Sequence, residues 1–388
     1  MTTNRVAAAK RIVVKIGSSL LVDGGSGQLK RGWLDSLTAD LAGARARGQE
    51  VVIVSSGAIA LGRRVLGLPP GVLKLEQAQA AAAVGQLQLA HAYEEAFRPH
   101  GLTIAQILVT PWDTEDRRRY LNARSTVATL LKLGAVPVVN ENDTVATHEI
   151  RYGDNDRLAA RVAQMTSADL LILLSDVDGL YSADPNTDGS ARFIEEVRGI
   201  TPEIEAMAGE TGPKTAARMG SGGMATKLSA AKIALAAGCH MVIASGQVDH
   251  PVAAIEGGAR ATWFLAQASP LTARKKWIAG TLKPQGALAL DEGAVAALRQ
   301  GRSLLPAGVT GVSGVFERGD AVSLHDPAGR EIGRGLCAYS SSDAHAIKKR
   351  RSQEIEAILG FRGRDEMVHR DDLVLQDDSR TNGNGDRP

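Results

Sequence analysis

The sequence predicts an α/β fold in which a largely parallel β-sheet is covered by helices on both faces, followed by a smaller β-rich domain. Over roughly the first 265 residues, short apolar runs rich in β-branched residues and leucine alternate with helix-length segments. Strands that are apolar throughout are typical of parallel sheets buried on both faces. Near Thr272 the pattern changes to short strands separated by turn residues, which predicts the second domain.

The expected elements follow from apolar runs bounded by Gly, Ser, Asp or Pro. In the first domain we expect strands at residues 12–14, 51–54, 103–109, 136–139, 170–174 and 241–244, and helices at 34–46, 76–97, 123–133 and 224–237. In the second we expect strands at residues 303–306, 309–316, 321–324 and 331–338, with a lone helix at 291–299. The domains are therefore expected at residues 1–270 and 280–372, with a polar, disordered tail at 373–388.

Composition excludes several classes of protein. The chain carries 45 Lys and Arg against 43 Asp and Glu, a net charge of +2, which argues against nucleic-acid binding as its main role. Cys239 and Cys337 lie far apart and form neither a zinc motif nor a disulfide framework. The N-terminus lacks the apolar core of a signal peptide, and runs such as 170–174 are too short to span a bilayer. We expect a soluble cytoplasmic protein without membrane association.

Parallel α/β sheets bind ligands beyond the carboxyl ends of their strands, so the residues after each strand were considered first. Lys15 lies at the end of the first strand, before the turn Gly17-Ser18-Ser19. The second strand ends in Ser55-Ser56-Gly57, which opens a helix. Backbone N–H groups and the helix dipole favour an anion at such a turn, although Ser-Gly turns also punctuate many α/β proteins without binding anything.

Acidic and amide residues follow the later strands. Asn140-Glu141-Asn142-Asp143 ends the fourth strand, and Gly153-Asp154-Asn155-Asp156 comes soon afterwards. The fifth strand ends in Ser175-Asp176. These groups could bind an ammonium group, orient a lysine or hold Mg²⁺ through water, or they could simply form Asx-rich turns. Their recurrence at successive strand ends favours a functional role.

A glycine-rich turn precedes Lys227. Residues 219–227, MGSGGMATK, combine a flexible turn, a helix N-terminus and a lysine in the first helical turn, which is typical of a phosphate-binding loop. The chain thus offers two lysines and several acids but no catalytic His or Cys arrangement. Phosphoryl transfer to a carboxylate suits this set, because a carboxylate with a pKa near about 4.3 is already an ionised nucleophile at pH 7. Positive groups then lower the barrier by stabilising the transferring phosphoryl group.

Six segments together resemble the amino acid kinase family, and in particular its glutamate-phosphorylating members. They are VVKIGSSL, VSSGAIALG, VVNENDTVAT, RYGDNDRLAA, LLSDVDGLYSADP and GSGGMATKLSAA, in the family's order. Relatives that use aspartate, N-acetylglutamate, carbamate or UMP share the first lysine. The NEND and GDND segments and the second domain favour glutamate. LLPAGVTGVSGVFERGD and SQEIEAILG are similar to a PUA domain, so the resemblance covers residues 10–372.

The resemblance implies a three-layer αβα sandwich followed by a PUA-like domain. It also implies transfer of the γ-phosphate of ATP to the side-chain carboxylate of L-glutamate, giving L-glutamyl 5-phosphate, the first step of L-proline biosynthesis. Mg²⁺ is expected to accompany ATP, without a metal site made by the protein. Feedback inhibition by L-proline, a homo-oligomer and a functional contact with glutamyl phosphate reductase are further expectations.

Roles for individual residues are likewise implied by the resemblance. The expected catalytic residues are Lys15, Asp156 and Lys227, with Asp156 holding the lysines in place. Glutamate is expected to bind at Ser56, Asp143 and Asn155. Ala225 lacks a hydroxyl that many relatives carry at this position, so no side-chain contact is expected from it. The expected ATP-binding residues are Lys15, Ser175, Asp176, Ser221, Gly222, Gly223, Met224, Ala225, Thr226 and Lys227.

Two other functions were weighed. PUA domains also occur in RNA-modifying enzymes, so an RNA-binding or RNA-modifying protein is one alternative. Residues 281–370 carry 13 basic and 11 acidic residues, however, and this near-neutral balance argues against RNA binding as the main role. A catalytically inactive regulatory relative is the other alternative, and the presence of both lysines and both acidic clusters disfavours it.

Overall fold

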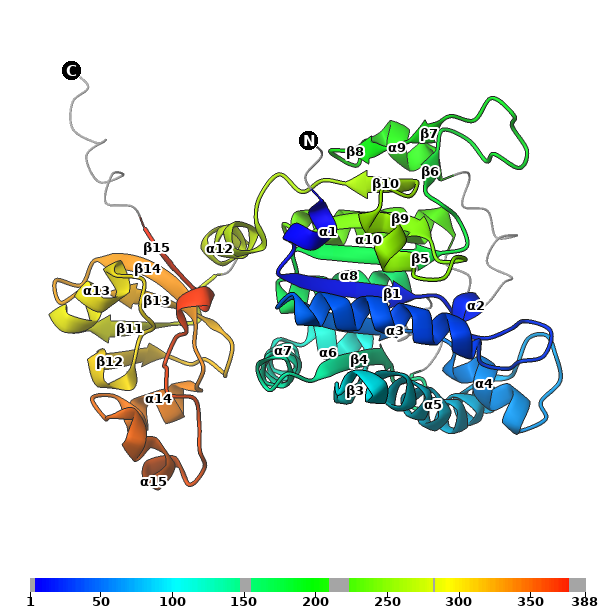
Figure 1. Ribbon diagram of the computed structural model, residues 1–388. Helices are drawn as coiled ribbons and strands as arrows, with labels where there is room; N and C mark the ends of the chain where they lie inside the picture. The colour runs from blue at the N-terminus through cyan, green and yellow to red at the C-terminus, as the bar shows by residue number, and fades with distance from the viewer. Residues whose placement is uncertain (1–3, 147–154, 209–222, 282, 377–388) are drawn as a thin grey trace, which may run out of the picture. The chain divides into compact units, whose positions relative to one another are not determined.

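A computed structural model describes residues 4–146, 155–208, 223–281 and 283–376 of the chain (Figure 1). The chain divides into two compact units, Met1–Pro270 and Leu271–Pro388. Each unit has its own hydrophobic core. None of the described helices combines the length and the apolar character needed to cross a membrane.

The first unit is built on an eight-stranded sheet with the strand order β3-β4-β2-β1-β5-β9-β10-β8. Among the described residues its neighbouring strands run parallel, except that β9 and β10 are antiparallel. This confirms the predicted largely parallel sheet. The strands are β1 (Arg11–Ile16), β2 (Glu50–Ser55), β3 (Ile104–Val109), β4 (Val136–Glu141), β5 (Leu170–Ser175), β8 (Glu196–Val197), β9 (His240–Ser245) and β10 (Ala261–Phe264), with a separate ribbon of β6 (Leu180–Tyr181) and β7 (Phe193–Ile194).

Helices cover both faces of this sheet, which confirms the three-layer αβα sandwich (Figure 1). One core lies between the sheet and α3 and α5; the other lies between the sheet and α7, α8 and α10. The helices are α1 (Arg5–Ala8), α2 (Ser18–Leu21), α3 (Arg31–Ala46), α4 (Ala58–Val65), α5 (Leu75–Phe97), α6 (Pro111–Glu115), α7 (Arg117–Lys132), α8 (Asn155–Thr166), α9 (Pro202–Ala206), α10 (Met224–Ala236) and α11 (Pro251–Glu256).

Period-two alternation decides which core each strand residue enters. In β1, Ile12, Val14 and Ile16 enter the core under α3 and α5, whereas Val13 enters the core under α8 and α10. Lys15 therefore lies on the same face as Val13, beneath α8 and α10. A lysine at this register position places a positive charge at the carboxyl end of a central strand.

Two glycines let helices α4 and α5 cross in direct backbone contact. A Cβ at Gly62 would lie 1.8 Å from the carbonyl oxygen of Ala81, and one at Gly85 would lie 1.8 Å from that of Ala58. Any side chain at either position would force the helices apart, because real Cβ atoms do not approach other atoms so closely. The crossing anchors the first half of α5 beside the loop that follows β2, where Gly57 has a φ of +105°.

The second unit contains a five-stranded sheet with the order β12-β11-β13-β14-β15. Its core includes Leu288, Phe316, Leu324 and Val368. The elements are α12 (Pro270–Thr281), β11 (Gly286–Leu290), α13 (Glu292–Arg299), β12 (Val309–Gly314), β13 (Ala321–His325), β14 (Glu331–Leu336), α14 (Ser341–Ile347), α15 (Ile355–Leu359) and β15 (Leu373–Leu375).

Three expectations for the second unit were wrong in detail. Residues 373–375 were expected in the tail, but β15 pairs with β14 because Leu373 completes the core. The expected strand at 303–306 is a single bridge between Leu304 and Val368, followed by a 3₁₀ turn at Pro306–Gly308. The helix at Glu292–Arg299 is not alone, since α14 and α15 are present as well. Residues 377–388 lie outside the described part of the chain.

Candidate active site

The carboxyl ends of four adjacent strands meet at one edge of the first sheet. In the order β4-β2-β1-β5 these strands are parallel, so their ends lie side by side. The backbone N–H of Ser56 donates to the carbonyl of Ile16, which ties the end of β2 to the end of β1. As predicted from the sequence, this edge brings together Lys15 of β1, Ser56 after β2, the acidic and amide residues at the end of β4, and Ser175 of β5.

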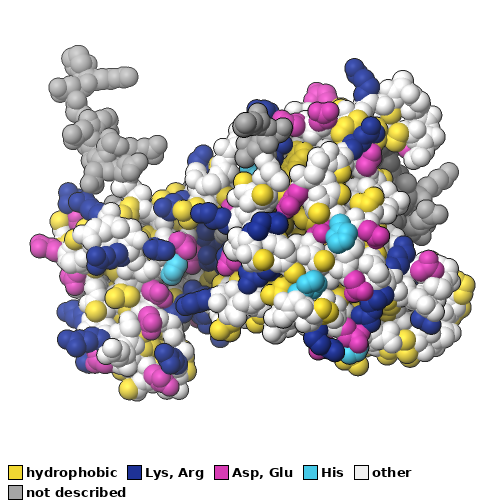
Figure 2. All heavy atoms as spheres, in the orientation of Figure 1, with side chains coloured by type: hydrophobic (Ala, Val, Ile, Leu, Met, Phe, Trp, Pro, Cys, Tyr) yellow, Lys and Arg dark blue, Asp and Glu magenta, His cyan; other side chains and the backbone are white. Residues whose placement is uncertain are grey.

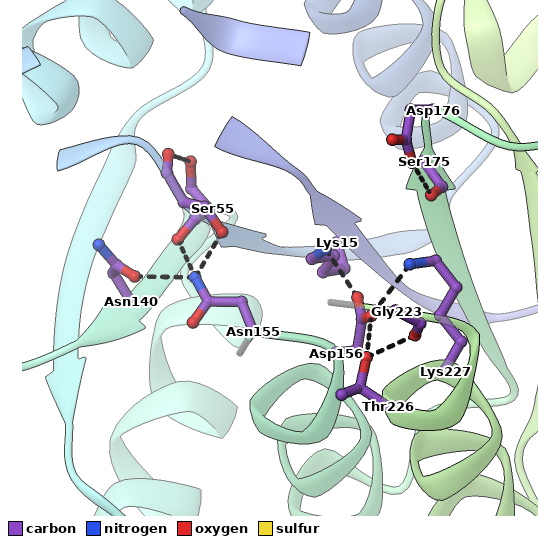
Figure 3. A network of polar contacts seen from close by, with 11 residues as sticks. Lys15, Ser55, Asn140, Asn155, Asp156, Ser175, Asp176, Gly223, Thr226 and Lys227 are labelled. Atoms are coloured by element: carbon purple, nitrogen blue, oxygen red, sulfur yellow. Dashed lines mark hydrogen bonds and ion pairs between the residues drawn. The ribbon is translucent and has the colours of Figure 1, made fainter. Parts of the chain in front are cut away.

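At the centre of this edge, two lysines share one buried carboxylate (Figure 3). Lys15 Nζ lies 2.6 Å from Asp156 Oδ1, and Lys227 Nζ lies 3.4 Å from Asp156 Oδ2. Asp156 is fully buried, and Lys15 and Lys227 are only 7% and 4% exposed. Asp156 was expected to hold both lysines, and the structure places the three side chains in contact. Buried charges of this kind are stable only when they are paired.

Three separate elements must meet to form this group of charges, and small side chains let them do so. Asp156 lies in the first turn of α8, and Lys227 lies in the first turn of α10. The two helices pack against each other, and their buried residues include the alanines Ala159, Ala163 and Ala230. Because the side chains at the contact set the distance between packed helices, alanines allow α8 and α10 to approach closely. Their N-terminal turns then converge over Lys15.

The electrostatics of the group are set by its two lysines. Burial by itself would raise the pKa of Asp156, but the charges of Lys15 and Lys227 outweigh that effect and hold the pKa below its usual value. Thr226 Oγ1 also lies 3.2 Å from Asp156 Oδ2. Asp156 is therefore ionised at neutral pH, and two ammonium groups surround one negative charge. Together with the N-terminus of α10, capped by Gly223, the arrangement favours an incoming anion.

A second polar group joins the ends of β2 and β4 to α8. Asn155 Nδ2 lies 2.7 Å from the carbonyl oxygen of Ser55, 2.8 Å from Ser56 Oγ and 3.1 Å from Asn140 Oδ1. Figure 3 shows the nitrogen of Asn155 facing Ser55 and Asn140. Asn155 and Asp156 are consecutive in α8, so this amide group lies beside the lysine–aspartate group. We name it the amide cluster: Ser55, Ser56, Asn140 and Asn155.

The remaining expected residues lie around these two groups. Ser175 ends β5, and its hydroxyl donates to the exposed carboxylate of Asp176 at 2.9 Å. Asp143 lies in the turn after β4 and is half-buried. Gly223, Met224, Ala225 and Thr226 form the start of α10. Ser221 and Gly222 lie outside the described residues.

Ser55 and Asn140 were named from the sequence within strand-end segments, but neither residue was given a role in the site. Asn140 lies on the same face of β4 as the apolar residues Val136 and Val138, two positions further along the chain. A polar residue that interrupts an apolar face at a strand end indicates a possible site residue. Ser55 carried a weaker signal, since Ser56 beside it was chosen instead. Only the contacts of the folded chain distinguish the two serines.

The carboxylates of this site do not form a dedicated metal cage. In the part of the chain that the structure describes, no group of three or more His, Cys, Asp or Glu side chains is placed to hold a metal ion. Asp156, one of the buried carboxylates at this edge, is engaged by two lysines.

Comparisons with known proteins agree with this geometry. The sequence profile of the amino acid kinase family matches residues 10–245, and that of the PUA domain matches residues 286–359. A glutamate 5-kinase of Paramagnetospirillum magneticum is 65% identical over 96% of this chain and 99% of its own length. Glutamate 5-kinase 1 of Rhizobium meliloti is 62% identical over 94% of this chain and 92% of its own length. A glutamate 5-kinase of Nitrobacter winogradskyi is 60% identical over 97% of this chain and 98% of its own length.

Proposed function

The chain belongs to the amino acid kinase family, and from this membership we propose that it transfers the γ-phosphate of ATP to the side-chain carboxylate of L-glutamate. The products are ADP and L-glutamyl 5-phosphate, and the reaction is the first step of L-proline biosynthesis. The observation that carries the proposal is the pair of buried lysines held on Asp156 at the carboxyl edge of the sheet. The curated relatives named as glutamate 5-kinases support the choice of acceptor.

The chemistry needs positive charge more than it needs a base. The acceptor carboxylate is ionised at pH 7, because a glutamate side chain has a pKa of about 4.3. The barrier then comes from positioning and from charge on the transferring phosphoryl group. In the proposed mechanism, Lys15 binds the phosphates of ATP and Lys227 faces the transferring phosphoryl group. Asp156 holds both ammonium groups in place, and its lowered pKa keeps its own carboxylate ionised for this role.

The two substrates are assigned to opposite sides of the lysine–aspartate group. ATP is assigned to Ser175, Asp176 and the start of α10, where Gly223, Met224, Ala225 and Thr226 present backbone N–H groups. Ser221 and Gly222 extend this assignment by their place in the sequence. Glutamate is assigned to Ser56, Asp143 and Asn155, at the ends of β2 and β4. In-line transfer between the two sides would pass beside Lys227.

A divalent metal ion enters the proposal as part of the nucleotide. We propose that ATP binds as its Mg²⁺ complex, in which the ion would neutralise part of the charge on the phosphates. Asp176, exposed at the end of β5, is the described carboxylate best placed to contact such a complex from the ATP side. The protein's own residues bind and orient the two substrates.

Three further properties extend the proposal to regulation and cellular context. L-proline carries the same ammonium and α-carboxylate groups as glutamate, so feedback inhibition through the glutamate side of the site fits the chemistry. We also propose that the protein is a cytoplasmic homo-oligomer. A functional contact with glutamyl phosphate reductase is part of the proposal as well, because the acyl phosphate product is labile. RNA binding is not proposed as the main function, because residues 281–370 carry 13 basic and 11 acidic residues. Figure 2 shows both kinds of side chain on one face of the second unit.

Trapping of the acyl phosphate with hydroxylamine tests the proposed reaction. Purified protein is incubated with ATP, Mg²⁺ and one amino acid at a time, and the hydroxamate formed is measured. We expect product with L-glutamate that depends on both ATP and Mg²⁺. Product with aspartate or N-acetylglutamate, and none with glutamate, would contradict the acceptor assignment. A filter-binding assay with RNA tests the alternative class of function on the same preparation.

A further inference from the structure

Helix α5 contacts the amide cluster from the side opposite the lysines. Asn140 Nδ2 donates to Gln86 Oε1 at 2.8 Å, and the hydroxyls of Tyr93 and Ser55 lie 2.9 Å apart. Gln86 and Tyr93 are seven residues apart, which places them on one face of α5. Both of their partners in turn accept from Asn155, so α5 supports the amide cluster at two points.

The contact from Gln86 determines which way the amide of Asn140 faces. Asn140 Oδ1 accepts from the backbone N–H of Glu141 at 2.9 Å and from Asn155 Nδ2 at 3.1 Å. Its Nδ2 is held on the opposite side by Gln86. If the amide of Asn140 turned over, its NH₂ group would face two donors, the backbone N–H of Glu141 and Nδ2 of Asn155. Gln86 therefore stabilises the orientation in which Asn140 accepts from Asn155.

The orientation of Asn155 follows from that of Asn140. Its NH₂ group has two hydrogens and lies within reach of three acceptors, so it is fully engaged. Among the described residues no donor bonds to Asn155 Oδ1, and Figure 3 shows this oxygen turned away from Ser55 and Asn140. Asn155 thus presents its carbonyl oxygen, rather than its NH₂ group, on the side that faces away from Ser55 and Asn140. An oxygen held in this way accepts a hydrogen bond from a cationic ligand.

We propose that Gln86 is a positioning residue for the acceptor amino acid, acting through Asn140 to aim Asn155 Oδ1 at the substrate's α-ammonium group. The inference rests on the proposed function, in which Asn155 lies on the glutamate side of the site. The ammonium group is the only hydrogen-bond donor of free glutamate at neutral pH, so it is the group that a fixed carbonyl oxygen would select. The residues assigned to ATP do not take part in the contacts that join Gln86, Asn140 and Asn155.

The backbone of α5 is fixed where the proposal needs it to be. Gly85, directly before Gln86, is the residue at which α5 touches the backbone of α4. The backbones of α4 and α5 are already so close at Gly85 that even a Cβ atom would not fit between them, so α5 cannot move closer to α4. Gln86 is half-buried, and its side chain reaches Asn140 from a rigid base. The hydrogen bond between Gln86 and Asn140 is therefore preorganised, and it can hold the amide of Asn140 in one orientation before a ligand binds.

Steady-state kinetics of Gln86 variants in the full-length protein test the proposal. Gln86→Met removes the acceptor and keeps the length of the side chain, whereas Gln86→Glu keeps an acceptor for Asn140 Nδ2. We expect Gln86→Met to raise KM for glutamate about tenfold, because the loss of one hydrogen bond changes an equilibrium by roughly that factor. KM for ATP and kcat should stay within about threefold of wild type, and Gln86→Glu should restore most of the glutamate KM.

Controls separate positioning from stability. Gln88→Met changes an exposed glutamine on the same helix and should leave both KM values unchanged. In an Asn140→Ser background, Gln86→Met should add little, because its effect passes through Asn140. An unchanged glutamate KM in Gln86→Met, or equal losses for ATP and glutamate, would overturn the proposal. A wild-type enzyme that does not phosphorylate glutamate would instead refute the proposed function, which these variants do not address.

Discussion

Two buried aspartates, one in each unit, are paired in different ways. Asp156 in the first unit contacts two lysines from different elements, at 2.6 and 3.4 Å. Asp372 in the second unit accepts two hydrogen bonds from one arginine, Arg274, at 2.9 Å from Nε and 2.5 Å from Nη2. All five side chains are buried. The first group carries two positive charges for one negative charge, and the second is a matched pair.

The different pairing of Asp156 and Asp372 separates a buried ion pair that serves stability from one that also serves ligand binding. Two nitrogens of the Arg274 guanidinium donate to one oxygen of Asp372, and this pair holds α12 to the turn before β15. At Asp156 two ammonium groups from different elements share one carboxylate at the carboxyl edge of the sheet, and this arrangement favours an incoming anion. In a site for ATP, that anion is supplied by the phosphates. We therefore expect removal of each aspartate to affect stability, but only Asp156 to affect catalysis.

Replacing each aspartate with asparagine gives the largest expected effects. Asp156→Asn removes the buried carboxylate that Lys15 and Lys227 contact, and Asp372→Asn removes the one that Arg274 contacts. Breaking a buried pair in this way costs about 3–5 kcal/mol of stability. Urea-induced unfolding should report a loss in both variants, while hydroxamate formation should be abolished only in Asp156→Asn. A folded Asp372→Asn protein without activity would invalidate the comparison.

Lys227→Ala tests whether the extra positive charge serves the reaction. Removal of one preorganised group that stabilises developing charge raises the barrier by about 2.7–4 kcal/mol. We expect kcat to fall by the corresponding factor, with a smaller change in KM for ATP. Lys232→Ala is the matched control, because Lys232 lies on the same helix but is exposed and paired with Glu205. An unchanged kcat with a raised KM for ATP would reduce Lys227 to a binding residue.

Asp143→Ala extends the comparison to the acceptor side of the site. Asp143 is only half-buried, so its loss should affect stability little. A hydrogen bond to a charged group contributes about 1.5–3 kcal/mol, so KM for glutamate should rise roughly tenfold to a hundredfold. Inhibition by L-proline should weaken in parallel if proline shares this pocket. A lowered Tm with an unchanged glutamate KM would show that Asp143 only shapes its turn.

The pH dependence of the free energy of unfolding tests whether the pKa of Asp156 is lowered in the folded protein. The pKa of Asp156 is lowered in the folded protein from its usual value of 3.8. At pH values between the folded-state pKa and the unfolded-state pKa of Asp156, the unfolded chain binds more protons than the folded chain. The free energy of unfolding therefore rises with pH in this range. The contribution of Asp156 is therefore complete above about pH 5 and is lost as the pH falls through the folded-state pKa. The stability difference between wild type and Asp156→Asn, measured by urea unfolding, should shrink in acid and stay constant between pH 6 and pH 8.

Removing the second unit should have the smallest effect on catalysis. A chain that ends after Pro270 keeps every described residue assigned to ATP or glutamate. We expect it to form the hydroxamate with a kcat close to that of the full chain. Circular dichroism establishes that the shortened protein is folded. A folded but inactive product would show that the second unit contributes to the reaction.

The sequence predicted the layout of the first unit better than that of the second. Apolar runs such as residues 170–174 are long, uninterrupted and rich in β-branched residues or leucine, so each was found. β11 reads Gly-Ala-Leu-Ala-Leu, and its glycine and alanines have little strand preference, so it was missed. β15 is three residues long and is a strand only because β14 lies beside it. Short strands of this kind depend on partners distant in the sequence.

What the sequence determined by itself was the chemistry available at the strand ends. Lys15, Asp156 and Lys227, and the acidic and amide residues after β4, were all identifiable from residue type and position. Parallel strands carry their ends to one edge, so proximity of these groups could be expected without coordinates.

Only the tertiary structure decided which groups touch. The alanine-lined packing of α8 against α10 places Lys227 on the same carboxylate as Lys15. The alternation of β4 turns Asn140, rather than its acidic neighbours, toward Gln86 on α5. These contacts join residues far apart in the chain. Their distances depend on how closely whole helices and strands pack, which local residue patterns do not encode.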